Sequence, residues 1–334
     1  MDKSIHVLGC GSIGLLFASS VIRRFPKQDI SMLLRPHHRH RLNINDGCND
    51  TPETIQCYLQ STYTTSTKYL NKCNPVNLPA EIIGERDDEI KNLLLCAKAH
   101  DCKHAVSSIS NRILPISKII ILSNGALAIR DELKRFFPSN QIILASTTHG
   151  AYCLNETTNP DKDPSAFQVV HAGNGDTFIE DEIISELLNS AGLNSFYVSE
   201  SQMNIMLWKK LAANCAINCI TSLHNIPNGE LDQLKYQKII EEIIQEVSAV
   251  AIAENIELSD ALNFEKLNDF VYDVIRRTSK NKSSMLQDIL AKRKETEINY
   301  LNGYIVHLAQ QHGMPAPQNK KMCSKIFDLC ASNK

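Results

Sequence analysis

A lysine and two asparagines recur at helical spacing within an otherwise apolar stretch of the chain. Lys210, Asn214 and Asn218 follow one another at intervals of four residues, so in an α-helix they lie on one face. The residues between them, from Leu207 to Ile217, are mostly apolar, which predicts a buried helix. Buried ammonium and amide groups cost free energy unless each finds a partner. The pattern therefore favours a helix face that offers these groups to a ligand.

The same spacing has a second interpretation that involves no ligand. Lys210 could extend its ammonium group to water, and the two asparagines could bond to neighbouring backbone groups. Lys209 offers a comparison inside the motif, because it lies about 100° around the helix from Lys210. Spacing alone leaves both interpretations open, so the elements that would position this helix have to be considered.

A glycine-rich loop connects the first apolar strand, Ser4–Leu8, to a helical segment. Residues 9–14 have the G-x-G-x-x-G spacing of dinucleotide-binding loops, in the strand–loop–helix context that this motif requires. Gly9 permits the tight turn, Gly11 lets a pyrophosphate approach the backbone, and Gly14 permits close packing of helix on strand. Helix N-terminal amides would then hold the phosphate charge. The expected cofactor contacts in this loop are Gly9, Gly11, Ser12, Ile13 and Gly14.

The residue that follows the second strand, Ile30–Leu34, favours NADP(H) over NAD(H). NAD-binding chains place an acidic residue about 20 residues after the glycine motif, where it binds the ribose 2′-hydroxyl. This chain has Arg35 there, with Arg39 and Arg41 close behind and no acidic residue among them. A guanidinium group suits a 2′-phosphate. NADP(H) is therefore the expected cofactor, and a basic surface loop is the alternative.

Further apolar strands are expected at residues 92–97, 119–123 and 141–145. Ligands of open α/β sheets bind beyond the carboxyl ends of the strands. The polar residues that follow these strands are therefore candidate contacts: Lys98, Asn124 and His149.

Two other stretches of this half carry structural expectations only. Residues 45–80 form a polar surface excursion with one strand at residues 55–59. Residues 167–171 and 176–179 are expected to form a hairpin around residues 172–175.

Near residue 198 the pattern changes to one that is nearly all helical. Apolar residues then recur at three- and four-residue spacing in residues 201–224, 229–255, 263–277, 283–311 and 319–331. The sequence thus predicts an α/β Rossmann-type domain over residues 1–198, which binds NADP, and an all-α domain over residues 199–334, which binds substrate and carries the catalytic groups.

Composition limits the class of protein and its partners. A length of 334 residues suggests two domains, and 43% hydrophobic with 22% charged residues is typical of a soluble globular protein. The net charge of −2 gives no reason to expect nucleic acid or a membrane surface as partner. The 11 cysteines include no Cys-x-x-Cys pair, so we expect reduced thiols, a cytoplasmic location and no metal site. The histidine-rich residues 37–40 are interpreted as a solvated basic loop.

Several short motifs follow one another along nearly the whole chain: GCGSIGLLFA at residues 9–18, SNG at 123–125, LWKKLAANCAIN at 207–218, PNGEL at 227–231, SSMLQD at 283–288 and TEINYLNG at 296–303. In this order they resemble the ketopantoate reductases, also called 2-dehydropantoate 2-reductases. The resemblance implies NADPH-dependent reduction of ketopantoate, a small 2-oxo acid, to pantoate in pantothenate and coenzyme A biosynthesis.

The resemblance also implies a role for individual residues. Lys210 would be the general acid that protonates the ketone oxygen, and Glu297 would complete the catalytic site. Asn124 would lie beside the nicotinamide, while Arg35 and Lys98 would bind the 2′-phosphate end. The implied substrate contacts are Asn214, Asn218, Asn281 and Ser284.

Some features depart from the family pattern or leave alternatives open. One extra residue precedes the TEI motif, so Glu297 could be displaced, and Cys219 stands where the family has proline. Glu297 could also be an exposed helix carboxylate, and Ser284 an ordinary helix N-cap. Other functions to consider are a reductase of another 2-oxo acid, a non-catalytic NADPH sensor and a scaffold that uses residues 45–80. Residues 263–277 and 319–331 could present the face of a homodimer.

Overall fold

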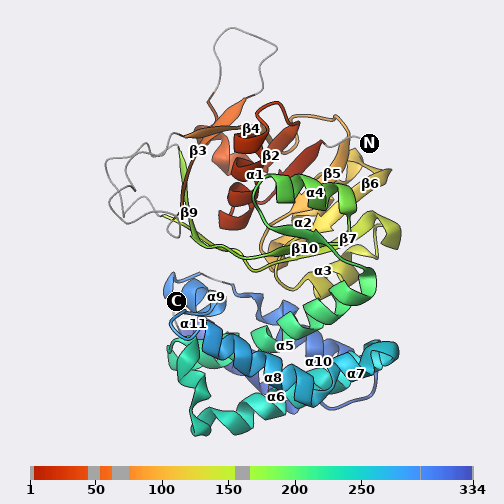
Figure 1. Cartoon of the computed structure of the whole chain (residues 1–334), viewed down its shortest axis with the longest axis vertical. Helices are drawn as coiled ribbons and strands as arrows, with labels where there is room; N and C mark the ends of the chain where they lie inside the picture. Colours follow the sequence, from red (N-terminus) through yellow and green to blue (C-terminus); the bar gives the residue numbers. More distant parts are fainter. Residues whose placement is uncertain (1–3, 44–52, 62–74, 155–165, 294, 333–334) are drawn as a thin grey trace. The chain divides into compact units, whose positions relative to one another are not determined.

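The computed structural model of this chain describes residues 4–43, 53–61, 75–154, 166–293 and 295–332. The chain divides into two compact units, Met1–Ser199 and Glu200–Lys334. The first is an α/β unit of Rossmann type, and the second is helical (Figure 1). The fold class predicted from the sequence is therefore confirmed. Among the described residues, no helix combines the length and the apolarity needed to cross a bilayer.

The described part of the first unit is built on an 11-stranded sheet with the order β11-β10-β7-β6-β5-β1-β2-β4-β3-β9-β8. The six strands from β7 to β4 in this order run parallel. Central parallel strands are buried on both faces, which explains the continuous apolar runs in their sequences. The strands are β1 (Ile5–Leu8), β2 (Ile30–Leu34), β3 (Thr54–Ser61), β4 (Val76–Ile82), β5 (Ile90–Leu95), β6 (Ile113–Ile121), β7 (Ile142–Thr147), β8 (Gly150–Cys153), β9 (Phe167–Gly173), β10 (Thr177–Ile179) and β11 (Ser195–Tyr197).

The described α-helices of this unit are α1 (Ser12–Arg24), α2 (Ala99–Ser107), α3 (Ala126–Leu133) and α4 (Glu182–Ser190). Of these, α1, α3 and α4 contact strands of the sheet. α1 contacts α4, and α2 contacts α3 (Figure 1). The buried face of α1 includes Leu15, Leu16 and Phe17, each fully buried in a hydrophobic core cluster of this unit. Burial of this face fixes the helix, and with it the loop that precedes its first residue.

The hairpin predicted around residues 172–175 is wrong. β9 pairs with β3 and β8, whereas β10 pairs with β7 and β11, so the chain between them crosses from one part of the sheet to another. A tight hairpin turn needs a residue with positive φ, and neither Gly173 nor Gly175 has one. A Cβ atom on Gly175 would lie 2.5 Å from the backbone nitrogen of His149. This glycine therefore permits close approach of two backbone segments instead of a turn.

The polar excursion predicted over residues 45–80 is also partly wrong, because its end belongs to strand β4. Val76, Leu78 and Ala80 alternate toward the core as strand residues should. Pro79 obscures this alternation, since proline is disfavoured inside strands; here it lies opposite Thr54 of β3. The predicted strand at residues 55–59 is confirmed as part of β3. The remainder of the excursion, at residues 44–52 and 62–74, lies outside the described residues.

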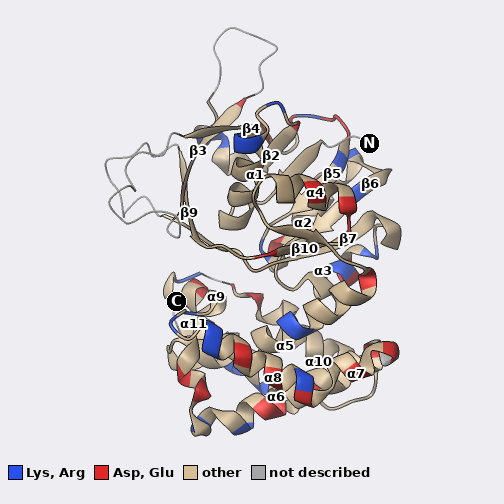
Figure 2. Cartoon of the chain, in the orientation of Figure 1, with Lys and Arg blue, Asp and Glu red and all other residues tan. Residues whose placement is uncertain are grey.

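The second unit consists of helices around α5 (Glu200–His224), which contacts α6, α8, α9 and α11. Trp208, at 2% exposure, lies in its core as expected. In both units, the Lys and Arg positions and the Asp and Glu positions are interspersed along the chain (Figure 2). The other described helices are η6 (Asn228–Asp232), α6 (Leu234–Glu254), η7 (Ile256–Leu258), α7 (Ser259–Leu262), α8 (Phe264–Arg277), α9 (Ser284–Leu290), η8 (Glu297–Tyr300), α10 (Asn302–Gln311) and α11 (Pro317–Ser332).

The helical pattern predicted over residues 283–311 is broken into three pieces: α9, the 3₁₀-helix η8 and α10. Lys292 has a φ of +53°, and Leu301 has a φ of −114° with a ψ of −99°; neither conformation is helical. Buried apolar residues such as Leu286 and Ile298 occur on both sides of the break. The apolar spacing therefore continues where the helix does not.

Candidate active site

The polar face predicted on α5 is present, and burial changes the chemistry of its lysine. Lys210 and Asn214 are half-buried, and Asn218 is 5% exposed. Burial lowers the pKa of the Lys210 ammonium group to about 8, against the opposing effect of the Glu297 carboxylate, which raises it. A group with such a pKa is mostly protonated at neutral pH and can still release its proton, as a general acid requires.

Glu297 is the first residue of η8 and is 6% exposed. The alternative of an exposed helix carboxylate is therefore wrong. Its charge acts on Lys210, so the extra residue in the sequence before it does not remove it from the lysine. The chain accommodates that residue in the break between α9 and α10.

Asn302, at the start of α10, ties this segment to α5. Its side-chain nitrogen donates to the Cys215 carbonyl at 3.0 Å and to the Asn319 side chain at 2.9 Å. Because Cys215 adjoins Asn214, the bond fixes the η8–α10 segment beside the polar face. The sequence motifs assign no role to Asn302. Its position does indicate burial, because it adjoins Leu301 and lies one helical turn before Ile305, and a buried asparagine must be hydrogen-bonded.

Cys219, one helical turn after Cys215 on α5, joins the same network. Its thiol donates to the Cys215 carbonyl at 2.8 Å and to the Asn302 side-chain oxygen at 3.0 Å. A cysteine keeps its backbone N–H, so α5 continues unbroken to His224. The cysteines that the structure describes are free thiols.

Asn281 lies in the turn before α9, and Ser284 is the first residue of that helix. Ser283, not Ser284, is the N-cap, because its hydroxyl accepts from the Leu286 N–H at 3.2 Å. Ser283 also shares a hydrogen bond of 2.8 Å with Thr221 of α5. Ser284 is thus half-buried without acting as the cap, and Asn281 is exposed. The hydrogen bond between Thr221 and Ser283 holds this segment against α5, about one turn beyond Asn218. Neither residue stands out in the sequence.

The glycine loop of the first unit shows three different steric requirements. Gly9 has a φ of +120°, and a Cβ atom there would lie 2.6 Å from the Ala97 nitrogen. A Cβ atom on Gly14 would overlap the Gly9 carbonyl oxygen. At Gly11 a Cβ atom would meet nothing within 4 Å, so the space above it is open. α1 begins there without a side-chain cap and without an acidic residue in its first turn. Open space at uncapped helix amides fits a phosphate group.

Basic residues lie beside this loop. Arg35 follows β2 and Lys98 precedes α2, so both lie past the carboxyl ends of strands that flank β1. Burial raises the pKa of the Cys10 thiol in this loop, and the charges of Arg35 and Arg41 oppose that rise by lowering the pKa. Arg35 also forms an ion pair of 2.7 Å with Asp101 of α2. The residues predicted for the 2′-phosphate thus gather near the phosphate loop.

Residues 37–40 belong to the short 3₁₀-helix η1 (Pro36–Arg41) and are largely exposed, as a solvated basic segment should be. His38 is the exception. Its Nε2 lies 3.2 Å from the Cys10 thiol, and burial lowers its pKa to about 4. This contact joins the basic segment to the glycine loop.

Asn124 is half-buried between β6 and α3, and the next residue, Gly125, has a φ of +71°. His149 has a structural role. Its Nε2 lies 3.0 Å from the Leu193 carbonyl, and its Nδ1 lies 2.9 Å from His171 and 3.1 Å from the Gly175 N–H. Since the carbonyl only accepts, Nε2 donates and Nδ1 accepts. His149 therefore holds the crossing of the two backbone segments near Gly175.

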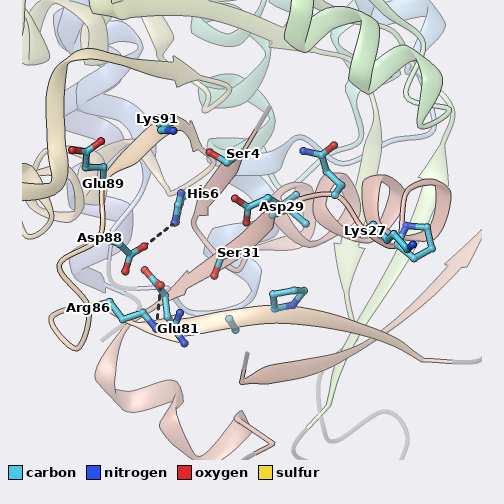
Figure 3. Close-up of a pocket in the computed structure, with 15 residues that line it drawn as sticks. Ser4, His6, Lys27, Asp29, Ser31, Glu81, Arg86, Asp88, Glu89 and Lys91 are labelled. Carbon is cyan, nitrogen blue, oxygen red and sulfur yellow. Dashed lines mark ion pairs between the residues drawn. The ribbon is translucent and has the colours of Figure 1, made fainter. Parts of the chain in front are cut away.

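A cavity of about 650 Å³ lies elsewhere in the first unit, where β1 and β2 begin (Figure 3). His6, Glu81 and Asp88 line it with ligand atoms within 4.8 Å of one another. Arg112, 2% exposed, donates to Glu81 at 2.5 Å and to Asp88 at 3.2 Å. A buried guanidinium group already neutralises these carboxylates, which disfavours a divalent cation. The cavity lies at the opposite ends of β1 and β2 from the glycine loop.

Comparison with known proteins gives matches over both units. The family model described as ketopantoate reductase PanE/ApbA matches residues 5–182, and the model of its C-terminal part matches residues 202–327. The 2-dehydropantoate 2-reductase of Vibrio cholerae is 34% identical over 71% of this chain and 77% of its own length. The enzyme of that name from Shigella flexneri is 32% identical over 96% of this chain and 93% of its own length.

A solved structure of D-mandelate dehydrogenase with NADH and anilino(oxo)acetate has a similar fold, with a TM-score of 0.77 and 20% identity over 99% of both chains. The matches of fold and sequence define this chain as an oxidoreductase. It belongs to the ketopantoate reductase family.

Proposed function

We propose that this protein reduces 2-dehydropantoate to pantoate with NADPH, and that Lys210 is the general acid. The observation that carries the proposal is the polar face of α5. There a lysine with a pKa of about 8 is coupled to the buried Glu297. The names of the relatives from Vibrio cholerae and Shigella flexneri support this substrate.

The nicotinamide, when bound, supplies a hydride to the ketone carbon. Lys210 first donates a hydrogen bond to the ketone oxygen and then transfers its proton as negative charge develops there. The ketone, one hydride on its carbon and one proton on its oxygen thus give a secondary alcohol, and the lysine is left neutral until solvent reprotonates it. Such proton donation is typically worth about 10²–10⁴-fold in rate. Glu297 holds Lys210 in its charged form between turnovers, because its carboxylate raises the pKa of the lysine.

The remaining polar groups orient the substrate. Asn214 and Asn218 share the helix face of Lys210, and amide groups both donate and accept, so they suit a hydroxyl and a carboxylate. Asn281 and Ser284 extend the same set from the turn that is bonded to α5. Holding a substrate in one orientation is itself a large part of catalysis.

NADP(H) fits the features of the first unit. The open space at Gly11 and the uncapped start of α1 suit the pyrophosphate. Arg35 and Lys98 suit the 2′-phosphate, and Asn124 would contact the nicotinamide. We infer from these groups a preference for NADPH over NADH.

The first test is the loss of NADPH absorbance with ketopantoate, repeated with NADH and with a panel of 2-oxo acids. We expect rapid oxidation of NADPH with ketopantoate. Turnover only with a different acid would establish a reductase of that acid. NADPH binding without turnover on any substrate would leave a sensor and refute the enzymatic proposal.

Two neighbouring lysines test the role of Lys210. Lys210→Ala should lower kcat about 10²–10⁴-fold, whereas Lys209→Ala should keep most of the activity. Lys209 has an environment of its own, with its ammonium group 5.9 Å from the ring centre of Phe270. Equal losses from the two substitutions would refute the assignment. The homodimer and the cytoplasmic location stay predictions, which light scattering and cell fractionation would check.

A further inference from the structure

The guanidinium group assigned to the 2′-phosphate already has an anionic partner. Arg35 forms an ion pair of 2.7 Å with Asp101, and both side chains are partly exposed, at 46% and 37%. Asp101 is the third residue of α2, whereas Arg35 directly follows β2. The pair therefore joins elements that flank β1, whose carboxyl end carries the glycine loop. The imidazole of His100 also lies near this carboxylate, at 4.0 Å.

A carboxylate in this place affects the two cofactors differently. A 2′-phosphate that binds Arg35 must displace Asp101 from the guanidinium group, and two anions near one another repel. The 2′-hydroxyl of NADH is neutral and can donate a hydrogen bond to a carboxylate. NAD-binding chains use an acidic residue after the second strand for this purpose. Here the acidic residue comes from α2 instead.

We propose that Asp101 determines cofactor specificity by competing for Arg35 and so narrows the preference for NADPH over NADH. This inference rests on the proposed role of Arg35 in binding the 2′-phosphate. It predicts a chain that binds NADPH less tightly than its basic residues alone would allow. Because the pair is partly exposed, its contribution is modest and decreases with added salt.

The test is the affinity of the purified protein for each nucleotide, measured by nicotinamide fluorescence at low ionic strength and without substrate. Asp101→Asn should bind NADPH about two- to fivefold more tightly, while its affinity for NADH stays the same or falls. The gain for NADPH should shrink in high salt. Glu186→Gln is the matched control, because it removes the same charge from an exposed position of α4 and should alter neither affinity.

A second variant tests whether Asp101 acts through Arg35 or only through its negative charge near the nucleotide. In an Arg35→Ala background, Asp101→Asn should no longer increase the affinity for NADPH selectively. Weaker NADPH binding by Asp101→Asn alone, an equal change for both nucleotides, or no change would overturn the inference and leave the proposed function intact. A wild-type protein that binds neither nucleotide would overturn both.

Discussion

The pH dependence of turnover should report the coupling between Lys210 and Glu297. If Lys210 must be protonated to act, kcat decreases as pH rises through its pKa of about 8. Replacing Glu297 by Gln removes the charge that raises this pKa, and a nearby opposite charge typically shifts a pKa by about one unit or more. The descending limb should therefore move to about pH 7. At about pH 7.5 the protonated fraction would fall from roughly three quarters to one quarter, a loss of about threefold, with little change near pH 6.

The assay is kcat at saturating NADPH and ketopantoate over a range of pH from about 6 to 9.5. Glu295→Gln is the matched control, because Glu295 is exposed and lies two residues before Glu297; it should leave the limb in place. A limb that stays at the same pH in Glu297→Gln, or that moves upward, would refute the coupling. A uniform loss of kcat at all pH values would assign Glu297 a role in the transition state that does not act through the pKa of Lys210.

Three further predictions concern the scaffold. Gly14→Ala should lower the melting temperature, because its Cβ would overlap the Gly9 carbonyl oxygen, whereas Gly11→Ala should fold normally and bind NADPH more weakly; equal melting temperatures would contradict this. Asn302→Ala should lower the free energy of unfolding in urea by about 1–3 kcal/mol, since it leaves buried partners unpaired. Burial lowers the pKa of His171 below 6.5, so the unfolded state binds more protons and stability falls as pH decreases below about 6.5; His171→Gln should show a shallower decline in acid melting curves.

Much of the fold follows from local signals in the sequence. The glycine spacing predicted the loop at residues 9–14, and the apolar run at Ile30–Leu34 has the observed bounds of β2. The errors arose where one local signal has two physical meanings. Gly173 and Gly175 serve close backbone approach instead of a turn, and sequence alone does not show which backbone segment will lie beside them.

The sequence predicts which polar residues share the face of α5. It does not predict the hydrogen bonds and ion pairs that hold those residues in place. The spacing of Lys210 and Asn214 already indicated one helix face, because helical periodicity is local. The bond from Asn302 to Cys215 joins residues far apart in sequence, and only the folded chain brings them together. The same holds for the ion pair of Arg35 with Asp101, which depends on the order of β2, β1 and β5 in the sheet.

The buried Arg112 has a consequence for how this chain can change by mutation. It serves as an internal counter-ion for Glu81 and Asp88, beside the imidazole of His6. Among the described residues of this cluster, Arg112 is the buried cation. Its substitution by a neutral residue such as methionine would leave the two carboxylates and the imidazole around a space without that charge. That is the ligand set of a transition-metal site. The Arg112 guanidinium group is thus what makes this cluster a structural ion-pair network instead of a set of groups open to a cation.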